Sequence, residues 1–378
     1  PSLYDVEVSL MSGSDVADNV KSYAAMRKIS TGKDKDDIMR VMLNNQPLFQ
    51  LGLLDQGYWP DGLYTAPTDD ALRYDIEVTK SLGYNLIRKH MKVEPARWYY
   101  YCDKLGMLVW QDMPAIGKST ETWTTNDWYS GKAGSLSAAA RTNFKNEWSD
   151  IIKQHISNPS IVVWTPFNEA WGQYQTASVV EMTQELDPTR IVNPASGGNH
   201  YQCGDILDIH DYSNPPSFIF YDATRPTVIG EFGGLQYNVE GHRWDESYTN
   251  SAYDNADDYT NAYTGIISSV SSLAKPVDGK AFSAAVFTQL TDVETEINGI
   301  MTYDRAMIKG DADKMTAANK ALCGILQDAT GINGTHADGS MAVEVGRFNT
   351  NGQRVGKTAT GVVIIKYSDG SARKTVIK

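Results

Sequence analysis

The chain has 378 residues, 41 % of them hydrophobic, and a formal net charge of −12. This length can supply a large core and exceeds the roughly 250 residues of one β/α barrel, so additional segments are expected. The net negative charge and the lack of a basic stripe argue against a nucleic-acid partner. The sequence contains no apolar run of about 18 residues, so we predict no membrane span.

The first 45 residues are predicted to be strands. Segments 3–10 and 22–29 are the candidates, and the turn-forming residues 12–14 lie between them. Two strands cannot form a stable domain by themselves. We therefore predict that residues 1–45 are the end of an immunoglobulin-like β-sandwich, and that upstream sequence is missing before Pro1, where no signal peptide is visible.

Residues 46–327 alternate short apolar runs with helical stretches. A repeated βα pattern predicts a parallel sheet covered by helices, and eight units predict closure into an α/β (β/α)₈ TIM barrel. A doubly wound open sheet is the alternative, but no GxGxxG turn follows the first strand. The candidate strands are 48–53, 84–88, 107–110, 161–164, 191–192, 206–209, 227–229 and 284–287, and the candidate helices are 69–82, 94–105, 136–155, 176–186, 257–273 and 313–326.

The last segment, 328–378, is predicted to be a linker followed by a small all-β appendage. Residues 328–340 are rich in Gly, Asn and Thr, as is typical of a linker. Segments 341–345 and 361–367 are candidate strands, and Asn351-Gly352 and Asp369-Gly370 are candidate hairpin turns.

Cysteine usage predicts neither a disulfide framework nor a metal site. Cys102, Cys203 and Cys323 are odd in number and far apart, and no CxxC or Cys/His spacing is present. No metal-ligand cluster stands out elsewhere in the sequence either, and we expect no metal and no cofactor.

Two glutamates follow apolar strands at positions that predict catalysis. Active sites of β/α barrels lie at the C-terminal ends of the strands. Glu169 follows the fourth strand and Glu231 follows the seventh, which lies nearly opposite it across a barrel mouth. A lone Glu here would be an ordinary ion-paired residue. Two facing carboxyls are what glycoside hydrolysis requires, at about 5–5.5 Å for retention of configuration and about 6.5–9.5 Å for inversion.

Five segments of the sequence resemble glycoside hydrolase family 2, which holds β-galactosidases, β-glucuronidases and β-mannosidases. Segment 159–173 contains the motif Asn168-Glu169-Ala170-Trp171 and resembles the acid/base strand of that family. The other four are 82–90, 105–112, 226–234 and 291–299. With the N-terminal strands, the resemblance covers about residues 1–327.

The resemblance implies a retaining exo-β-glycosidase, β-galactosidase-like, that acts by double displacement on a carbohydrate substrate. It implies that Glu169 is the acid/base and Glu231 the nucleophile. Asn168 would hydrogen-bond the sugar 2-hydroxyl, and Arg88 and Tyr212 would hold Glu231 ionised.

Other aromatic and polar residues are candidates for sugar binding. Aromatic rings stack on sugar faces, so Trp171 is a candidate for sugar binding. Segment 55–62 could build a subsite wall with Trp59 and Tyr58 as platforms, or it could equally be a structural loop. The remaining candidates line the sugar site or are strand-end residues satisfied by their neighbours; they are His90, Asp112 and His210.

The sequence also supports expectations about the substrate, the alternative functions and the location of the protein. The family's β-glucuronidases read a carboxylate with an Asn-x-Lys motif. In this sequence Asn-x-Lys occurs at 19–21, outside the barrel, and at 143–145, within the candidate helix 136–155 rather than after a barrel strand, and we expect that the substrate is not a glucuronide. An endo-β-mannanase or glucanase of the same clan, and an inactive carbohydrate-binding protein, are the alternatives. Residues 348–355 and 361–370 resemble the C-terminal sorting domain of the Bacteroidetes type-nine secretion pathway, which implies a secreted, periplasmic or cell-surface protein; an ordinary accessory β-module is the alternative.

Overall fold

The computed structural model describes residues 2–114, 123–131, 136–327, 344–349, 353–356, 358–367 and 372–377. The chain divides into two compact units, Pro1–Leu326 and Gln327–Lys378. None of the helices in the described ranges combines the length and the apolar character that a membrane span requires.

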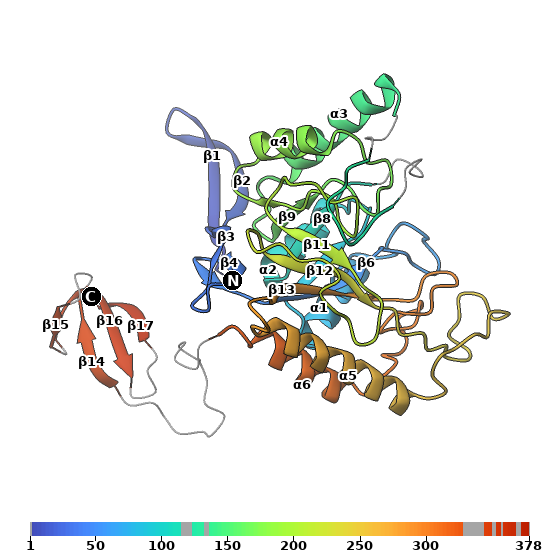
Figure 1. Cartoon of the computed structure of the whole chain (residues 1–378). Coiled ribbons are helices and arrows are strands. Elements are labelled where there is room, and N and C mark those ends of the chain that lie inside the picture. Colours follow the sequence, from blue (N-terminus) through green and yellow to red (C-terminus); the bar gives the residue numbers. More distant parts are fainter. Residues whose placement is uncertain are drawn as a thin grey trace. The chain divides into compact units, whose positions relative to one another are not determined.

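The first unit is built on one curled parallel sheet of eight strands (Figure 1). The sheet contains every strand predicted for residues 46–327, and its order is β10-β9-β8-β7-β6-β13-β12-β11. The strands are β6 (Gln50–Asp55), β7 (Leu86–Lys89), β8 (Leu108–Asp112), β9 (Ile161–Thr165), β10 (Ile191–Val192), β11 (Leu207–His210), β12 (Thr227–Gly233) and β13 (Phe282–Thr288).

The predicted closure of the barrel is confirmed only in part, because β10 and β11 do not pair as strands. β10 pairs with β9 only. The gap is spanned instead by the Gly197 N–H, which donates to the Asp208 carbonyl at 2.9 Å, and by Asn193 Nδ2, which donates to Asp208 Oδ2 at 2.7 Å. The ends of the sheet are therefore joined by loops and side chains.

Six helices accompany the sheet within a few residues of the predicted bounds. Side chains cap several of them; for example, Thr68 accepts from the Ala71 N–H at the start of α1, and left-handed Gly106 ends α2 with a φ of 73°. No helix separates β10 from β11 or β11 from β12. The helices are α1 (Asp69–Ser81), α2 (Ala96–Leu105), α3 (Ala138–His155), α4 (Thr176–Leu186), α5 (Ala256–Ala274) and α6 (Ala312–Cys323).

Large aromatic residues form much of the core, both on the strands and on the helices that cover them. Trp98, Trp110, Trp148 and Trp164 are all fully buried. Trp110 Nε1 donates to Gln50 Oε1 at 2.8 Å, so its one polar group is satisfied inside the barrel. The many tryptophans therefore stiffen the scaffold that holds the site, rather than chiefly offering surfaces to a sugar.

The N-terminal strands form a hairpin and a small antiparallel sheet. β1 (Tyr4–Ser12) pairs with β2 (Asp15–Ala24), and β3 (Ile29–Lys33), β4 (Met39–Leu43) and β5 (Gln46–Pro47) form the sheet. The predicted strand at 22–29 was wrong in its bounds. β2 begins directly after the turn at Gly13 and Ser14, and its many polar residues, exposed on both faces, hid the strand pattern. Membership of an immunoglobulin-like sandwich stays a prediction.

The second unit contains a four-stranded antiparallel sheet of order β15-β14-β16-β17. Its strands are β14 (Glu344–Phe348), β15 (Arg354–Val355), β16 (Gly361–Tyr367) and β17 (Ala372–Ile377). β16 has the predicted bounds. β14 overlaps the strand predicted at 341–345, of which 341–343 lie outside the described residues, as do both predicted turns.

Candidate active site

Glu231 lies within β12 and Glu169 lies four residues beyond the end of β9. The Glu169 N–H donates to the Ser196 carbonyl at 2.9 Å, and Glu169 has a left-handed φ of 51°. Such a backbone costs energy in a residue other than glycine and is concentrated at functional sites. Glu231 is buried, whereas the side chain of Glu169 is 23 % exposed. One carboxyl is thus enclosed and the other reaches solvent.

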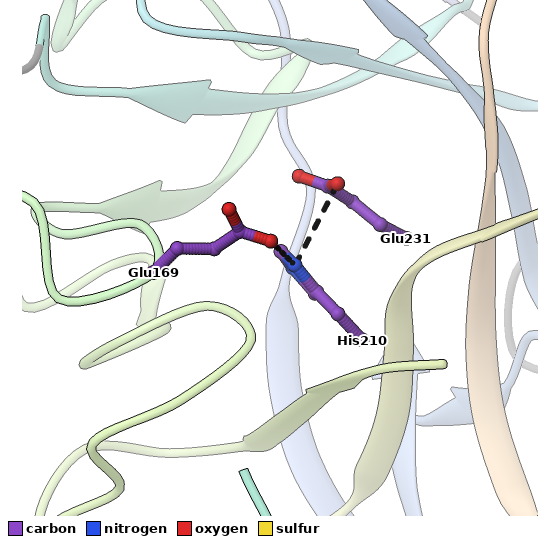
Figure 2. Close-up of side chains that lie close together, drawn as sticks. All are labelled: Glu169, His210 and Glu231. Atoms are coloured by element: carbon purple, nitrogen blue, oxygen red, sulfur yellow. Dashed lines mark hydrogen bonds and ion pairs between the residues drawn. The ribbon is translucent and has the colours of Figure 1, made fainter. Parts of the chain in front are cut away.

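His210 joins the two glutamates from β11 (Figure 2). Its Nδ1 lies 2.8 Å from Glu169 Oε1 and 3.6 Å from Glu231 Oε2. One carboxylate oxygen of each glutamate and a ring nitrogen of His210 all lie within 4.8 Å of one another. One oxygen of Glu169 and one oxygen of Glu231 thus lie closer together than the roughly 6.5 Å carboxyl separation at which inversion begins, which favours retention. The same three ligand atoms could also hold a metal ion, a group that the sequence did not predict.

Arg88, fully buried on β7, supports the site from below. Its guanidinium lies 3.2 Å from Glu231 Oε1 and 2.9 Å from Asp112 Oδ2, and Nη2 donates to Asn168 Oδ1 at 2.7 Å. Burial alone would raise the pKa of Asp112, but the charge of Arg88 and the hydrogen bond to His90 outweigh it and lower the pKa. The guanidinium thus fixes three site residues and keeps Asp112 ionised.

Tyr212 contacts the other oxygen of Glu231. Its hydroxyl donates to Glu231 Oε2 at 2.5 Å and lies 3.1 Å from Thr288 Oγ1. Burial alone would raise the pKa of Glu231, but the charges of His210 and Arg88, assisted by this hydrogen bond, lower it. Glu231 is therefore an ionised carboxylate near neutral pH, as a nucleophile must be.

Burial also acts against the charge of His210. Taken alone it would lower the pKa, yet the charge of Glu231, the hydrogen bond to Glu169 and the charge of Asp208 raise it. Nε2 of His210 lies 2.7 Å from Ser196 Oγ, which donates to Asp208 Oδ2 at 2.6 Å. A hydrogen-bonded chain thus runs from a buried aspartate to the exposed glutamate.

A cavity of about 440 Å³ opens beside the two glutamates. Six of the ten predicted site residues line it; they are His90, Asn168, Glu169, Trp171, Tyr212 and Glu231. Trp171 is 44 % exposed and free to stack on a sugar ring. The other residues of its wall are Leu54, Gln56, Tyr58, Tyr64, Met91, Thr288, Glu296 and Asn298.

The remaining four predicted residues do not line the cavity. Arg88, Asp112 and His210 lie behind its wall and hold residues that do. Trp59 is only 6 % exposed and packs under the guanidinium of Arg305, whose Cζ lies 3.8 Å from the ring. Segment 55–62 is thus a packed loop at Trp59, while its neighbour Tyr58 reaches the cavity. Sugar contact by these four stays a prediction.

The cavity wall also includes three residues that were not singled out as site residues from the sequence, namely Gln56, Glu296 and Asn298. Gln56 directly follows β6, and a strand-end position is a signal that could have been used. Glu296 and Asn298 lie in the loop after β13, where the sequence offered several polar residues without ranking them. One of these, Asp292, instead forms a buried ion pair with Lys309 at 2.5 Å.

Comparison with known proteins agrees with this geometry. The family model described as the TIM barrel domain of glycosyl hydrolases family 2 matches residues 41–309. A β-glucuronidase of Bacteroides fragilis is 27 % identical over 206 residues, 52 % of this chain and 27 % of its own. A β-galactosidase of Leuconostoc mesenteroides is 25 % identical over 215 residues, 55 % of this chain and 19 % of its own.

Among solved structures, a β-galacturonidase of the same family from Eisenbergiella tayi, bound to galacturonate, superimposes with a TM-score of 0.64 at 19 % identity. The match covers 85 % of this chain and 58 % of that one. This likeness shows a shared fold. The chain thus spans about a fifth to a quarter of the two curated relatives that it matches in sequence.

Proposed function

The chain belongs to glycosyl hydrolase family 2, and on that premise we propose that it is a retaining exo-β-glycosidase of the β-galactosidase type. The observation that carries the proposal is the spacing of Glu169 and Glu231, whose oxygens lie within 4.8 Å of each other. Carboxyls with oxygens this close favour a direct nucleophile over the wider spacing by which an inverting enzyme accommodates a water between carboxyl and sugar.

The proposed reaction has two steps. Glu231 attacks the anomeric carbon while Glu169 gives its proton to the leaving oxygen, which breaks the glycosidic bond and forms a covalent glycosyl-enzyme. Glu169 then takes a proton from water as that water attacks the same carbon, which releases the sugar and restores both carboxyls. Arg88 and Tyr212 stabilise the ionised Glu231, and His210 orients both glutamates.

The cavity supports a glycone site with aromatic contacts. Trp171 would offer its exposed ring to a sugar face, and Tyr58 would do so from the loop after β6. Asn168, held by Arg88, would keep its amide nitrogen for the 2-hydroxyl, a contact that strengthens in the transition state.

The C-terminal unit supports a proposal about location. Its antiparallel sheet is compatible with the resemblance to a type-nine sorting domain, and the corresponding proposal is that the protein is secreted or held at the cell surface. Expression of the full chain in a host with that pathway, followed by fractionation with and without residues 328–378, tests it. Retention inside the cell with the tail present would contradict it.

A panel of para-nitrophenyl β-glycosides tests the function. We expect the wild-type chain to hydrolyse at least one β-sugar with retention of configuration, observed by nuclear magnetic resonance of the first-formed product. Glu231→Gln should lose at least about 10⁴-fold in kcat. Inversion, or activity that survives the substitution, would refute the assignment, and cleavage of mannan or glucan instead would favour the endo-acting alternative.

A further inference from the structure

Four polar side chains form one hydrogen-bonded cluster at the wall of the cavity. Gln56 follows β6, Gln289 follows β13, and Glu296 and Asn298 lie in the loop beyond β13. Three of them line the cavity together with Glu231, and Gln289, 1 % exposed, supports them from behind. The proposed reaction uses none of the four.

The side-chain amide hydrogens of the two glutamines all have acceptors within this cluster. Gln56 Nε2 donates to Gln289 Oε1 at 2.9 Å and to Glu296 Oε2 at 3.0 Å. Gln289 Nε2 donates to Glu296 Oε2 and to Asn298 Oδ1, both at 2.8 Å. Each glutamine therefore uses both amide hydrogens, and Glu296 and Asn298 are held in fixed orientations.

Two groups of the cluster are left for a ligand. Within the described part of the chain, neither Glu296 Oε1 nor Asn298 Nδ2 has a protein hydrogen-bond partner. The first can only accept and the second can only donate. A sugar hydroxyl can both donate and accept, so sugar hydroxyls suit both of these groups. A carboxylate substituent accepts only, and it would leave Glu296 without a donor.

The charge of the cavity wall also favours a neutral sugar. Two carboxylates, Glu231 and Glu296, line the cavity beside Glu169, the proposed proton donor, and the described lining residues include no Lys or Arg. Nearby cations are committed elsewhere: Lys92 Nζ lies 2.9 Å from Glu94 Oε1 and donates to the Gly57 carbonyl at 2.7 Å. Arg88 is neutralised by Asp112 and Glu231. A ligand carboxylate would therefore meet like charge from both residues. Repulsion from the buried Glu231 is weakly screened, whereas the exposed Glu296 is screened by solvent and acts at short range.

We propose that Glu296 and Asn298 are specificity-determining residues that bind a hydroxyl of a neutral glycone and exclude sugars carrying a carboxylate. The inference rests on the proposed glycosidase function and assigns its preference for neutral β-glycosides to two residues. It also gives Gln289 a positioning role, because that buried amide holds both residues.

Matched pairs of substrates test the proposal. We would measure kcat/KM of the full chain for the para-nitrophenyl β-galactoside and β-galacturonide, and for the β-glucoside and β-glucuronide, since each pair differs only in the exocyclic carbon. The expected ratio favours the neutral sugar by at least about 100-fold. Glu296→Gln, which removes the charge but keeps the shape, should reduce the ratio of kcat/KM for the neutral sugar to that for its uronide at least about tenfold. Glu294→Gln, an exposed residue of the same loop outside the cavity, should leave it unchanged.

Failure of this inference is distinguishable from failure of the proposed function. Uronides hydrolysed within about threefold of their neutral partners, or a ratio that Glu296→Gln does not move, would overturn the inference while leaving the glycosidase intact. If no substrate turns over, calorimetric titration with galactose and galacturonate decides. Tighter binding of galactose that Glu296→Gln weakens supports the inference, whereas equal binding of both sugars, or of neither, overturns it.

Discussion

Nδ1 of His210 lies 2.8 Å from Oε1 of Glu169. The imidazole on β11 therefore holds the proposed proton donor, which lies in the loop after β9. The same nitrogen lies 3.6 Å from Glu231. The orientation of both glutamates therefore depends on one buried ring, which the chain of Asp208 and Ser196 fixes from behind.

Replacing His210 by Asn should reduce stability in a pH-dependent way. The pKa of His210 is raised in the folded chain: burial alone would lower it, but Glu231, Glu169 and Asp208 outweigh burial and the opposing charge of Arg88. The stabilisation is then fully present below about pH 6.5, the pKa of an unfolded histidine, and is lost as the pH rises through the folded-state value. The substitution should therefore cost more at pH 6, roughly 1–3 kcal/mol, than at pH 9.

Urea unfolding at the two pH values measures that difference. His242→Asn is a matched control, because His242 Nδ1 lies 2.7 Å from Asp304 Oδ2 but the two side chains are 31 % and 28 % exposed. Such a solvated pair contributes little. An equal cost of His210→Asn at pH 6 and pH 9 would mean that the imidazole is uncharged in the folded protein.

Tyr212→Phe should lower kcat with little change in KM. The variant removes a hydrogen bond to the charged Glu231, an interaction of about 1.5–3 kcal/mol, which corresponds to roughly 10–150-fold in rate. Tyr64→Phe is the comparison, because Tyr64 lines the same cavity but its hydroxyl donates to the Met91 carbonyl at 3.3 Å. A Tyr212→Phe variant that changes only KM would indicate a role in binding.

Arg88→Met should destabilise the fold by about 3–5 kcal/mol at pH 7, because it leaves the buried Asp112 and Glu231 charged and uncompensated. Burial alone would raise the pKa of both carboxyls, but nearby groups lower it in the folded chain. Arg88 and His90 lower the pKa of Asp112, and His210 and Arg88 lower the pKa of Glu231. In the wild type, their contribution is present above about pH 4, the unfolded pKa, and is lost as the pH falls through the folded values.

Without the guanidinium, acid should therefore harm the variant less than the wild type. Chemical unfolding at pH 7 and pH 4 checks this, with Arg73→Met as the control. Arg73 pairs with Asp70 and Glu77 on the surface of α1 at 43 % exposure, where the loss should stay below about 1 kcal/mol. A similar loss for the two arginine variants would contradict the prediction.

The scaffold could be predicted from the sequence because its strands are continuous apolar runs, a pattern typical of parallel sheets covered on both faces. Strand ends then indicated Glu169 and Glu231. The resemblance implied that Arg88 and Tyr212 contact Glu231, and both contacts are present. The role of His210 could not be read in this way. The register between β11 and β12 shifts between Ile209 and His210, and only that local irregularity sets His210 opposite Glu231.

The cluster around Glu296 was also hidden from the sequence. The loop after β13 turns back on itself through hydrogen bonds between Val293 and Glu296, which bring Glu296 against Gln56, 240 residues earlier in the chain. No local pattern encodes such a contact. The N-terminal hairpin illustrates the opposite case, where polar residues on an exposed strand obscured a local element.

Glu169→Ala provides the most direct test of the two-step chemistry. The first step should fall about 10²–10⁴-fold for a phenyl glycoside, whose leaving oxygen needs a proton. It should fall far less for a dinitrophenyl glycoside, whose leaving group departs unaided. The second step then limits the rate, because no base activates water.

Azide should restore turnover of the dinitrophenyl substrate, because a small anion that needs no deprotonation can enter the space of the missing carboxylate. The product should be a glycosyl azide with the same anomeric configuration as the substrate. Glu181→Ala, an exposed residue on α4, should match the wild type with both substrates. An equal loss on both substrates without azide rescue would assign the proton transfer to another group, and His210, 2.8 Å away, would be the first to examine.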